Sequence, residues 1–430
     1  MAVIVILTPQ LLFWRTLFGI ALIGIASSTV FLGLVIVAAS QYRRRARIDA
    51  ERAASLGRDA FPPISILKPV HGVEERLEQN LESFFLQDYP NFEIVFGARS
   101  ADNDALVVVE KLRRKYPGAR VKVVLSGEPV WPNAKVYSLE KMIAESAHEF
   151  VVISDSDIWV AKQAMRNIVA PLLQNNVGLV TCIYRGVPSH DFGSGLEALG
   201  MSIEMTSGVV VADMLEGMKF ALGAIMATRK DVLRAIGGIS ATKDYYSDDF
   251  VLGNLIAAAG YKVVLSHQIV GHVLVPRSLG KTMADQLRWM KSTRFSRPKG
   301  HVGSGLTFST PFGLLALIAG GALDMTGLGI ALFAWSILNR IIQALVAGWG
   351  VTGDRRSLTL CWLYPLRDFL GFFLWVASFN GGTFFWRGEM YRFERGGRIV
   401  PEHRAASVVQ RATTKVTKDH EGSSPEIPIV

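Results

Sequence analysis

The feature that most restricts the fold is an uncharged stretch near the N-terminus, which runs from residue 16 to residue 42. About 20 apolar residues are enough to cross a bilayer as an α-helix. Four arginines follow directly, between Arg43 and Arg47, and predict that this end stays cytoplasmic and the N-terminus faces out. A cleaved signal peptide is the alternative, but its apolar core is shorter and its basic residues come first. We therefore expect residues 1–42 to form an uncleaved membrane anchor.

The composition is that of a membrane protein with one folded domain. Half of the 430 residues are hydrophobic and 19% are charged, which is less charge than soluble domains usually carry. Lys and Arg outnumber Asp and Glu by 46 to 37, which permits binding to nucleic acid, anionic lipid or a phosphate-bearing substrate. The hydrophobic character and the lack of a nucleic-acid module favour the last two. The two cysteines, Cys182 and Cys361, predict no disulfide framework and fit a reducing cytoplasmic face.

Residues from about 60 to 300 have the pattern of an α/β domain. β-rich runs alternate with segments of helical spacing, and this alternation predicts a mainly parallel sheet flanked by helices. The expected strands are 64–70, 92–98, 121–125 and 150–154, and the expected helices are 74–86, 105–116 and 137–147. Ligands of such sheets bind beyond the carboxyl ends of the strands, so the candidate site residues are those that follow the strands.

A second hydrophobic region forms the C-terminal membrane block, which we place at 305–386. The uncharged segment 306–323 and the segment 325–352, apolar apart from Arg340, predict two spans, and 369–386 spans or re-enters. The arginines that follow predict a cytoplasmic tail at 387–430, partly disordered from about 405. Four full spans would leave this tail outside, and a re-entrant or surface-lying third segment removes the conflict. We expect a multi-pass protein of the inner cell membrane with its α/β domain, 60–300, in the cytoplasm.

Two aspartates, Asp155 and Asp157, directly follow the last expected strand. Carboxylates at this spacing beyond a strand end can be directed at one ligand. Their oxygens suit Mg²⁺ or Mn²⁺, which bridge diphosphate oxygens and neutralise the charge of a departing nucleotide. A solvated turn is the alternative, because Ser and Asp are common in turns. We assign both residues to a metal site and Asp155 also to the binding of a donor substrate.

A second acidic pair, Asp248 and Asp249, stands between aromatic residues before an expected helix at 250–259. One carboxylate can act as a general base that takes a proton from an attacking hydroxyl. The alternative is a helix cap, since acidic residues are favoured at helix N-termini. Both roles can coexist, with Asp248 mainly structural and Asp249 catalytic.

Further candidates bind the donor substrate. Arg288 and Trp289, with Gln286 before them, can hold a diphosphate or stack on an acceptor, although an interfacial helix is the simpler interpretation. Lys135 contacts a donor phosphate or pairs with an aspartate. Asp102 and Asp104 follow the second expected strand, where a contact to uracil or ribose fits. The single histidines His71, His267 and His272 receive no role.

In this order the motifs resemble those of the ceramide glucosyltransferase family of inverting glycosyltransferases, which have a GT-A fold. That family carries three aspartate elements followed by a Q/R-x-x-R-W box. In this chain, the segments that resemble the three aspartate elements are 98–104, 154–157 and 248–250, and the segment that resembles the box is 285–289. The likeness runs from about residue 64 to residue 398 and includes a tail motif at 386–391. Asp285 departs from the box, and the His-Pro element of the animal enzymes has no counterpart around 204–211.

The resemblance implies a fold, a reaction and its partners. Asp155 and Asp157 would serve a UDP-sugar and its Mg²⁺ or Mn²⁺, Asp249 would be the base, and Arg288 and Trp289 would lie over diphosphate and acceptor. Attack by a lipid hydroxyl would give a β-glycoside from UDP-glucose or a related donor. Ceramide, diacylglycerol and a hopanoid all remain possible acceptors.

Two other functions stay open on the sequence. A processive polysaccharide synthase shares the fold and a similar box, but it needs a channel built from several helices. A non-catalytic membrane transporter or scaffold would leave the aspartates dispensable.

Overall fold

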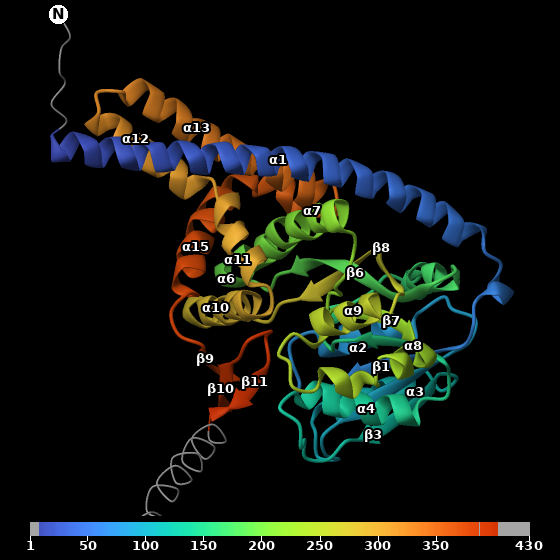
Figure 1. The fold of residues 1–430 in the computed structure, drawn as a ribbon. Coiled ribbons are helices and arrows are strands. Elements are labelled where there is room, and N and C mark those ends of the chain that lie inside the picture. The colour runs from blue at the N-terminus through green and yellow to red at the C-terminus, as the bar shows by residue number, and fades with distance from the viewer. Residues whose placement is uncertain (1–7, 387, 403–430) are drawn as a thin grey trace, which may run out of the picture.

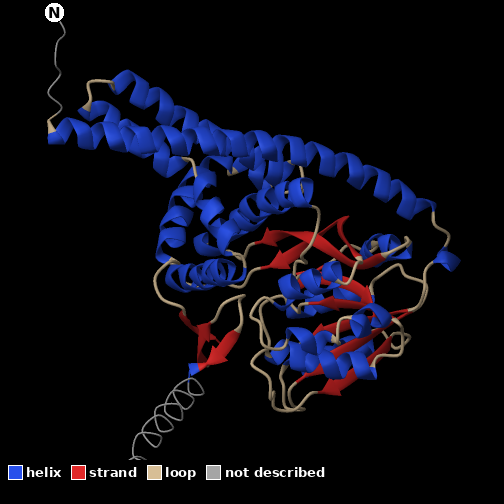
Figure 2. Ribbon diagram, viewed as in Figure 1, coloured by secondary structure: helices blue, strands red, loops and turns tan. Residues whose placement is uncertain are grey.

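A computed structural model describes residues 8–386 and 388–402 of the chain. An eight-stranded sheet flanked by helices forms one part of the molecule, and most of the long apolar helices gather along one side of it (Figure 1). Figure 2 shows this division between a mixed α/β part and a helical part.

The sheet is mainly parallel, as the sequence predicts. Four neighbouring strands run parallel to one another, in the order β3, β2, β1 and β4. The next strand, β7, is antiparallel to its two neighbours, β4 and β6. Strand β8 is parallel to β6, and β5 forms the edge of the sheet, antiparallel to β8. In this spatial order the strands are β3 (Arg120–Leu125), β2 (Phe92–Ala98), β1 (Ile64–Pro69), β4 (Phe150–Ser154), β7 (Ile225–Arg229), β6 (Val177–Val187), β8 (Lys262–Val273) and β5 (Ile158–Trp159).

Each central strand is buried on both faces, because successive side chains of a strand point to opposite sides. Ile66 of β1 belongs to one core cluster, shared with α2, α3 and α5, whereas Leu67 belongs to a second, shared with α4, α7 and α9. The helices of the domain are α2 (Leu77–Phe85), α3 (Ala105–Lys115), α4 (Ala134–Glu145), α5 (Ala164–Val169), α7 (Thr206–Glu216), α8 (Lys230–Ala235) and α9 (Asp248–Ala258).

The described part of the expected anchor, 1–42, lies in one helix, α1 (Pro9–Ser55), which continues beyond residue 42 through the arginine cluster. At about 1.5 Å per residue, its 47 residues exceed the length of one membrane span. Its first half packs beside α12 (Thr310–Ala322), and further along it packs on α7, where Arg45 forms an ion pair with Asp213 (Figure 1). The helix thus connects the apolar helices to the α/β domain.

Within the described residues, three helices are long and apolar enough to cross a membrane: Pro9–Ser55, Phe192–Glu216 and Thr326–Trp349. The bent pair Pro298–Thr307 and Thr310–Ala322, with a 51° angle, makes up to four. The segment Phe192–Glu216 was not expected, because Glu197, Glu204 and Asp213 interrupt its hydropathy. It consists of α6 (Phe192–Gly200), a π-helical turn and α7.

The C-terminal part differs in detail from the expected third membrane segment and tail. Helix α15 (Tyr364–Ala377) has 14 residues, fewer than the roughly 20 that a straight span needs. The chain then forms a small antiparallel sheet of β9 (Thr383–Trp386), β10 (Glu389–Phe393) and β11 (Ile399–Pro401). The part of the tail for which we predict disorder, from about 405, lies outside the described residues. The remaining helices are α10 (Leu279–Ser296), α11 (Pro298–Ser304), α13 (Thr326–Gln343) and α14 (Arg356–Thr359).

A buried ion pair holds the C-terminal helices together. Arg340 of α13 lies 3.2 Å from a carboxylate oxygen of Asp368 in α15, and both side chains are almost fully buried. The other carboxylate oxygen accepts the backbone N–H groups of Ser309 and Thr310 at 3.0 and 2.8 Å. These N–H groups belong to the start of α12 and have no partner within the helix, so one aspartate joins three helices.

We expect Asp368→Ala to destabilise the helical part by about 3–5 kcal/mol, because it leaves the Arg340 charge buried and unpaired. Thermal unfolding of the purified protein in detergent measures this effect as a lower midpoint. Asp324→Asn is the matched control, because Asp324 is exposed and its left-handed backbone suits Asn. Equal midpoints for Asp368→Ala and the control would contradict the structural role of this pair.

Candidate active site

Lys135 is the centre of an acidic cluster at the carboxyl edge of the sheet. The cluster consists of Asp155, Asp157, Asp248 and Asp249. The ammonium of Lys135 lies 2.6 Å from Oδ1 of Asp155, at the end of β4, and 4.0 Å from Oδ2 of Asp248, at the start of α9. Asn133 fixes the arrangement: its side chain caps α4 by accepting the N–H groups of Lys135 and Val136, and it donates to Oδ1 of Asp248 at 3.3 Å. The structure therefore brings together residues that lie more than a hundred positions apart.

The strand ends of the sheet determine the position of the cluster. Asp155 directly follows the fully buried Ser154, and its N–H donates to the carbonyl of Ala224 at 3.3 Å, next to the antiparallel strand β7. The neighbouring Gly223 faces Asp249: a Cβ atom at this position would lie 3.0 Å from Oδ2 of Asp249. A glycine here lets the backbone pass close to the carboxylate without displacing it.

Asp249 has the environment of a general base. Burial, together with the negative charge of Asp248, raises the pKa of Asp249 to about 6, although Lys135 acts in the opposite direction. Its Oδ1 accepts the N–H of Phe250 at 2.8 Å, which orients the carboxylate. A carboxylate whose pKa lies close to neutrality can take a proton from a hydroxyl group effectively. Asp248 instead contacts Asn133 and Lys135, which is the position of a structural residue.

The second aspartate of the D-x-D pair has a partner that the sequence did not single out. Oδ2 of Asp157 lies 3.2 Å from Nε2 of His272 in β8. Burial favours neutral imidazole, but the carboxylate of Asp157 raises the pKa of His272 above its ordinary value. The contact arises because the chain after Asp157 enters β5, whose residue Ile158 pairs with His272 across the sheet edge.

The residues present fit a divalent metal ion that shares its ligands with a bound diphosphate. In the described part of the chain, Oδ1 of Asp157 and Nδ1 of His272 are buried without a hydrogen-bond partner. No group of three or more His, Cys, Asp or Glu side chains among the described residues is arranged to hold a metal ion. Mg²⁺ needs fewer protein ligands when substrate phosphates supply the others. Asp157 and Asp155 are thus the candidate ligands, and His272 orients Asp157.

Lys68 lies directly behind the D-x-D pair and was also not singled out by the sequence. It is fully buried at the end of β1, donates to Oγ of Ser154 at 3.1 Å and to the carbonyl of Asp155, and lies over the Phe84 ring. Burial lowers the pKa of Lys68 to about 7, despite the nearby carboxylates. The signal in the sequence was a lysine inside a strand that is apolar apart from Ser65.

The box residues join α10 to the same loop. Arg288 donates from Nε to the hydroxyl of Tyr246 at 2.8 Å. Tyr246 lies three residues before Asp249. Asp285, the residue that departs from the family pattern, binds Arg288 at 2.9 Å and Arg277 at 2.6 Å. Asp285 therefore positions two arginines near the site.

The other box residues differ in exposure. Trp289 is 38% exposed, whereas Gln286 is buried. Trp289 also hydrogen-bonds to Tyr246, and the exposed part of its ring can stack on a ligand, whereas a buried Gln must act from inside the fold.

The structure leaves two candidates outside the cluster. Asp102 and Asp104 lie in the exposed loop after β2, at the same edge of the sheet. Over residues 8–386 and 388–402, no hydrogen bond or ion pair joins either side chain to Asp155, Asp157 or Asp249. Their proposed contact to a nucleoside therefore stays a prediction.

Comparison with known proteins identifies a family. The model of "Glycosyl transferase family 21" matches residues 21–399. Ceramide glucosyltransferase 1 of Caenorhabditis elegans is 25% identical over 79% of this chain and 73% of its own length. Ceramide glucosyltransferase 3 of the same organism is 24% identical over 89% and 83%.

Solved structures resemble the chain more distantly. The mannosyltransferase PcManGT from Pyrobaculum calidifontis, in complex with GDP-Man and Mn²⁺, is 18% identical and covers 82% of this chain and 98% of its own, with a TM-score of 0.42. Glucosyl-3-phosphoglycerate synthase from Mycobacterium tuberculosis, in complex with Mn²⁺, UDP and phosphoglyceric acid, is 19% identical over 55% and 78%, with a TM-score of 0.36.

We expect Lys135→Met to destabilise the protein by about 2 kcal/mol at pH 8 and by less at pH 5. Without the ammonium, burial and the neighbouring carboxylates raise the pKa of Asp155 further, so the folded state is favoured by protonation and penalised as the pH rises. Melting temperatures at the two pH values measure the difference. Lys219→Met is the control, because Lys219 is exposed. A deficit that is equal at both pH values would contradict the electrostatic role of Lys135.

Proposed function

Because the chain belongs to glycosyl transferase family 21 and is a ceramide glucosyltransferase-like glycosyltransferase, we propose that it transfers a hexose from a UDP-sugar to the hydroxyl of a membrane lipid. The reaction inverts the anomeric centre and gives a β-glycoside. UDP-glucose or a related nucleotide sugar is the donor, and ceramide, diacylglycerol or a hopanoid is the acceptor. The curated relatives are named for glucosyl transfer to ceramide, which supports this class of acceptor.

The observation that carries the proposal is the environment of Asp249. Its carboxylate, with a pKa raised to about 6 by burial and Asp248, faces Gly223 within the acidic cluster. As the lipid oxygen attacks the anomeric carbon, Asp249 takes the hydroxyl proton, the new C–O bond forms, and the bond from the sugar to UDP breaks. No covalent enzyme intermediate is needed, which agrees with a single displacement.

The surrounding residues fit the donor. Lys135, which pairs with Asp155, and Arg288, which binds Tyr246 in the loop before Asp249, supply positive charge that suits a diphosphate. Asp157 and Asp155 would hold Mg²⁺ or Mn²⁺, with His272 orienting Asp157. When bound, such an ion neutralises the negative charge that grows on the leaving UDP.

The helical part of the molecule supports a lipid acceptor. Apolar helices long enough to span a membrane lie along one side of the sheet (Figure 1). Helix α10 packs against α6 and α15, and its Arg288 binds Tyr246 in the loop before Asp249. A lipid headgroup at the membrane surface can therefore meet a water-soluble donor at the edge of the sheet. With the arginine cluster of α1 on the inside, the site faces the cytoplasm of a multi-pass protein of the inner membrane.

We expect Asp249→Asn to reduce sugar transfer at least about 100-fold, because the base is lost. The assay uses the purified full chain in detergent with UDP-glucose, Mg²⁺ or Mn²⁺ and a panel of ceramide, diacylglycerol and hopanoid acceptors. Asp59→Asn, at an exposed position, is the control. In the parent protein, kcat should fall as the pH drops through about 6, since Asp249 is then protonated. Full activity of Asp249→Asn, or no transfer to any lipid by the parent, would refute the proposal, and a polymeric product would indicate a polysaccharide synthase.

Chelation with EDTA should abolish transfer, and added Mg²⁺ or Mn²⁺ should restore it. Asp157→Asn should raise the metal concentration needed for half-maximal activity by at least about 10-fold, because it removes one charged ligand. Isothermal titration of UDP with and without metal gives an independent measurement. Unchanged UDP binding and transfer after complete metal removal would show that this site works without a metal ion.

A further inference from the structure

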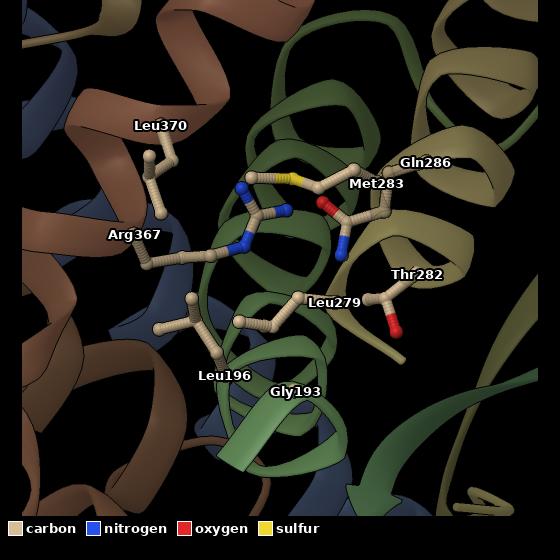
Figure 3. Close-up of a pocket in the computed structure, with 8 residues that line it drawn as sticks. All are labelled: Gly193, Leu196, Leu279, Thr282, Met283, Gln286, Arg367 and Leu370. Atoms are coloured by element: carbon tan, nitrogen blue, oxygen red, sulfur yellow. The ribbon is translucent and has the colours of Figure 1, made fainter. Parts of the chain in front are cut away.

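Buried basic side chains are rare in folded proteins, and two of them, Arg367 and Lys68, take no part in the proposed transfer reaction. Arg367 forms an ion pair with Glu204 at 3.2 Å and lines a hollow of about 10 Å³ between α6, α10 and α15, just enough for one water molecule (Figure 3). It therefore belongs to the packing of these helices. Lys68 instead lies directly behind Asp155 and Asp157, in the candidate active site.

Lys68 approaches these aspartates from the face of the sheet opposite to Lys135. It shares its face of β1 with Ile66, whose core cluster includes α2, and its Nζ lies 3.8 Å from the centre of the Phe84 ring in α2. Lys135 lies on α4, which packs in the other core cluster. Asp155 is therefore held from both faces, by its carboxylate on Lys135 and by its backbone carbonyl on Lys68.

The backbone carbonyl of Asp155 closes the turn that presents both aspartates. It accepts the N–H of Ile158 at 3.4 Å, the i to i+3 contact of a β-turn that contains Asp157. This contact is long for a hydrogen bond, whereas Lys68 donates to the same oxygen from an ammonium group, which is a stronger donor than an amide. Lys68 also donates to Oγ of Ser154 at 3.1 Å, and this hydroxyl donates to the carbonyl of Asp155 at 3.3 Å. Lys68 is thus the principal donor to the turn.

The turn has to hold two carboxylates that have different partners. Asp155 contacts Lys135 at 2.6 Å, and Asp157 contacts His272 at 3.2 Å. A metal ion shared by both aspartates needs their oxygen atoms at fixed positions, because Mg²⁺ tolerates little departure from octahedral geometry. A shift of the turn would move both side chains together, so a group that fixes the turn fixes the whole pair.

We propose that Lys68 is a positioning residue, which holds Asp155 and Asp157 in place for the metal ion and the donor diphosphate through the carbonyl of Asp155. The inference rests on the proposed function and deepens its donor half. Lys68 is fully buried behind the turn and acts through the aspartates.

The direction of the effect distinguishes positioning from simple electrostatics. A positive charge behind the ligands repels a cation, so the loss of the Lys68 charge would by itself strengthen metal binding. The loss of positioning weakens it.

Lys68→Met removes the donor group and keeps a long, unbranched side chain. With the full chain in detergent, we expect the Mn²⁺ concentration for half-maximal transfer from UDP-glucose to rise at least about 10-fold, the effect typical of groups that orient metal ligands. The Kd of UDP at a fixed Mn²⁺ concentration, measured by isothermal titration, should rise by a similar factor, and KM for the lipid should stay the same.

Lys230→Met is the matched control. Lys230 also donates to a backbone carbonyl, that of Ser146, at 2.6 Å, but it lies beside the amino end of β4, where Arg229 pairs with Phe150. This variant removes the same type of contact at the other edge of the sheet, so it should leave the Mn²⁺ requirement and the Kd of UDP unchanged. An equal loss of Mn²⁺ affinity in both variants would show a general effect of stability and overturn the inference.

Mn²⁺ binding is also read without turnover, from the electron paramagnetic resonance signal of free Mn²⁺ in the presence of UDP. Weaker binding by Lys68→Met than by the parent supports the inference even if the parent transfers sugar to no lipid, in which case the proposed function alone fails. Binding by Lys68→Met that equals or exceeds that of the parent overturns the inference, and so does a parent chain that binds no Mn²⁺.

Ser154→Ala decides the question if Lys68→Met does not fold. It keeps the lysine and removes the hydroxyl that joins Lys68 to the carbonyl of Asp155. Mn²⁺ binding about 3-fold weaker than in the parent, the effect of one neutral hydrogen bond, supports the inference, and unchanged binding overturns it.

Discussion

The ammonium of Lys135 is the interaction on which the rest of the site depends. Asp155, Asp157, Asp248 and Asp249 all lie at one edge of the sheet, and carboxylates so close together repel one another in a partly buried region. Lys135 lies between two of them and so lets the end of β4 and the start of α9 approach. Asn133 fixes the backbone that presents this lysine. The same charges that threaten the fold form the candidate active site.

The parts of the fold that were predictable from sequence are those with a regular pattern. The apolar run that ends at Ser154 predicted β4 and the position of Asp155 beyond it, because a buried strand of a parallel sheet has apolar side chains on both faces. The long helix Phe192–Glu216 was missed, since Glu197 and Glu204 lower its hydropathy. The role of Glu204 becomes visible only in the structure, where it pairs with Arg367 of α15, 163 positions further along the chain.

The site was predictable to a similar extent. The pairing of Lys135 with an aspartate was one of two options that its charge allowed. The contact of His272 with Asp157 was not predictable from the sequence. It depends on the short strand β5, and a two-residue strand has no sequence pattern of its own. Asp285 appeared to be a departure that weakened the box, yet it binds Arg288 and Arg277 and so maintains the arrangement. Sequence motifs name residue types, whereas such contacts depend on register between distant strands and helices.

The small sheet after α15 has a consequence for how the protein is made. Tyr246, which binds Arg288, packs its ring against Phe384 and Phe393 of this sheet, and its N–H donates to the carbonyl of Gly397. The ribosome synthesises these partners after α12, α13 and α15. The loop that carries Asp249 therefore reaches its final contacts last, once every hydrophobic helix has left the exit tunnel. A chain truncated before residue 383 would lack these partners of Tyr246, and the loop that carries Asp249 would be left unsupported.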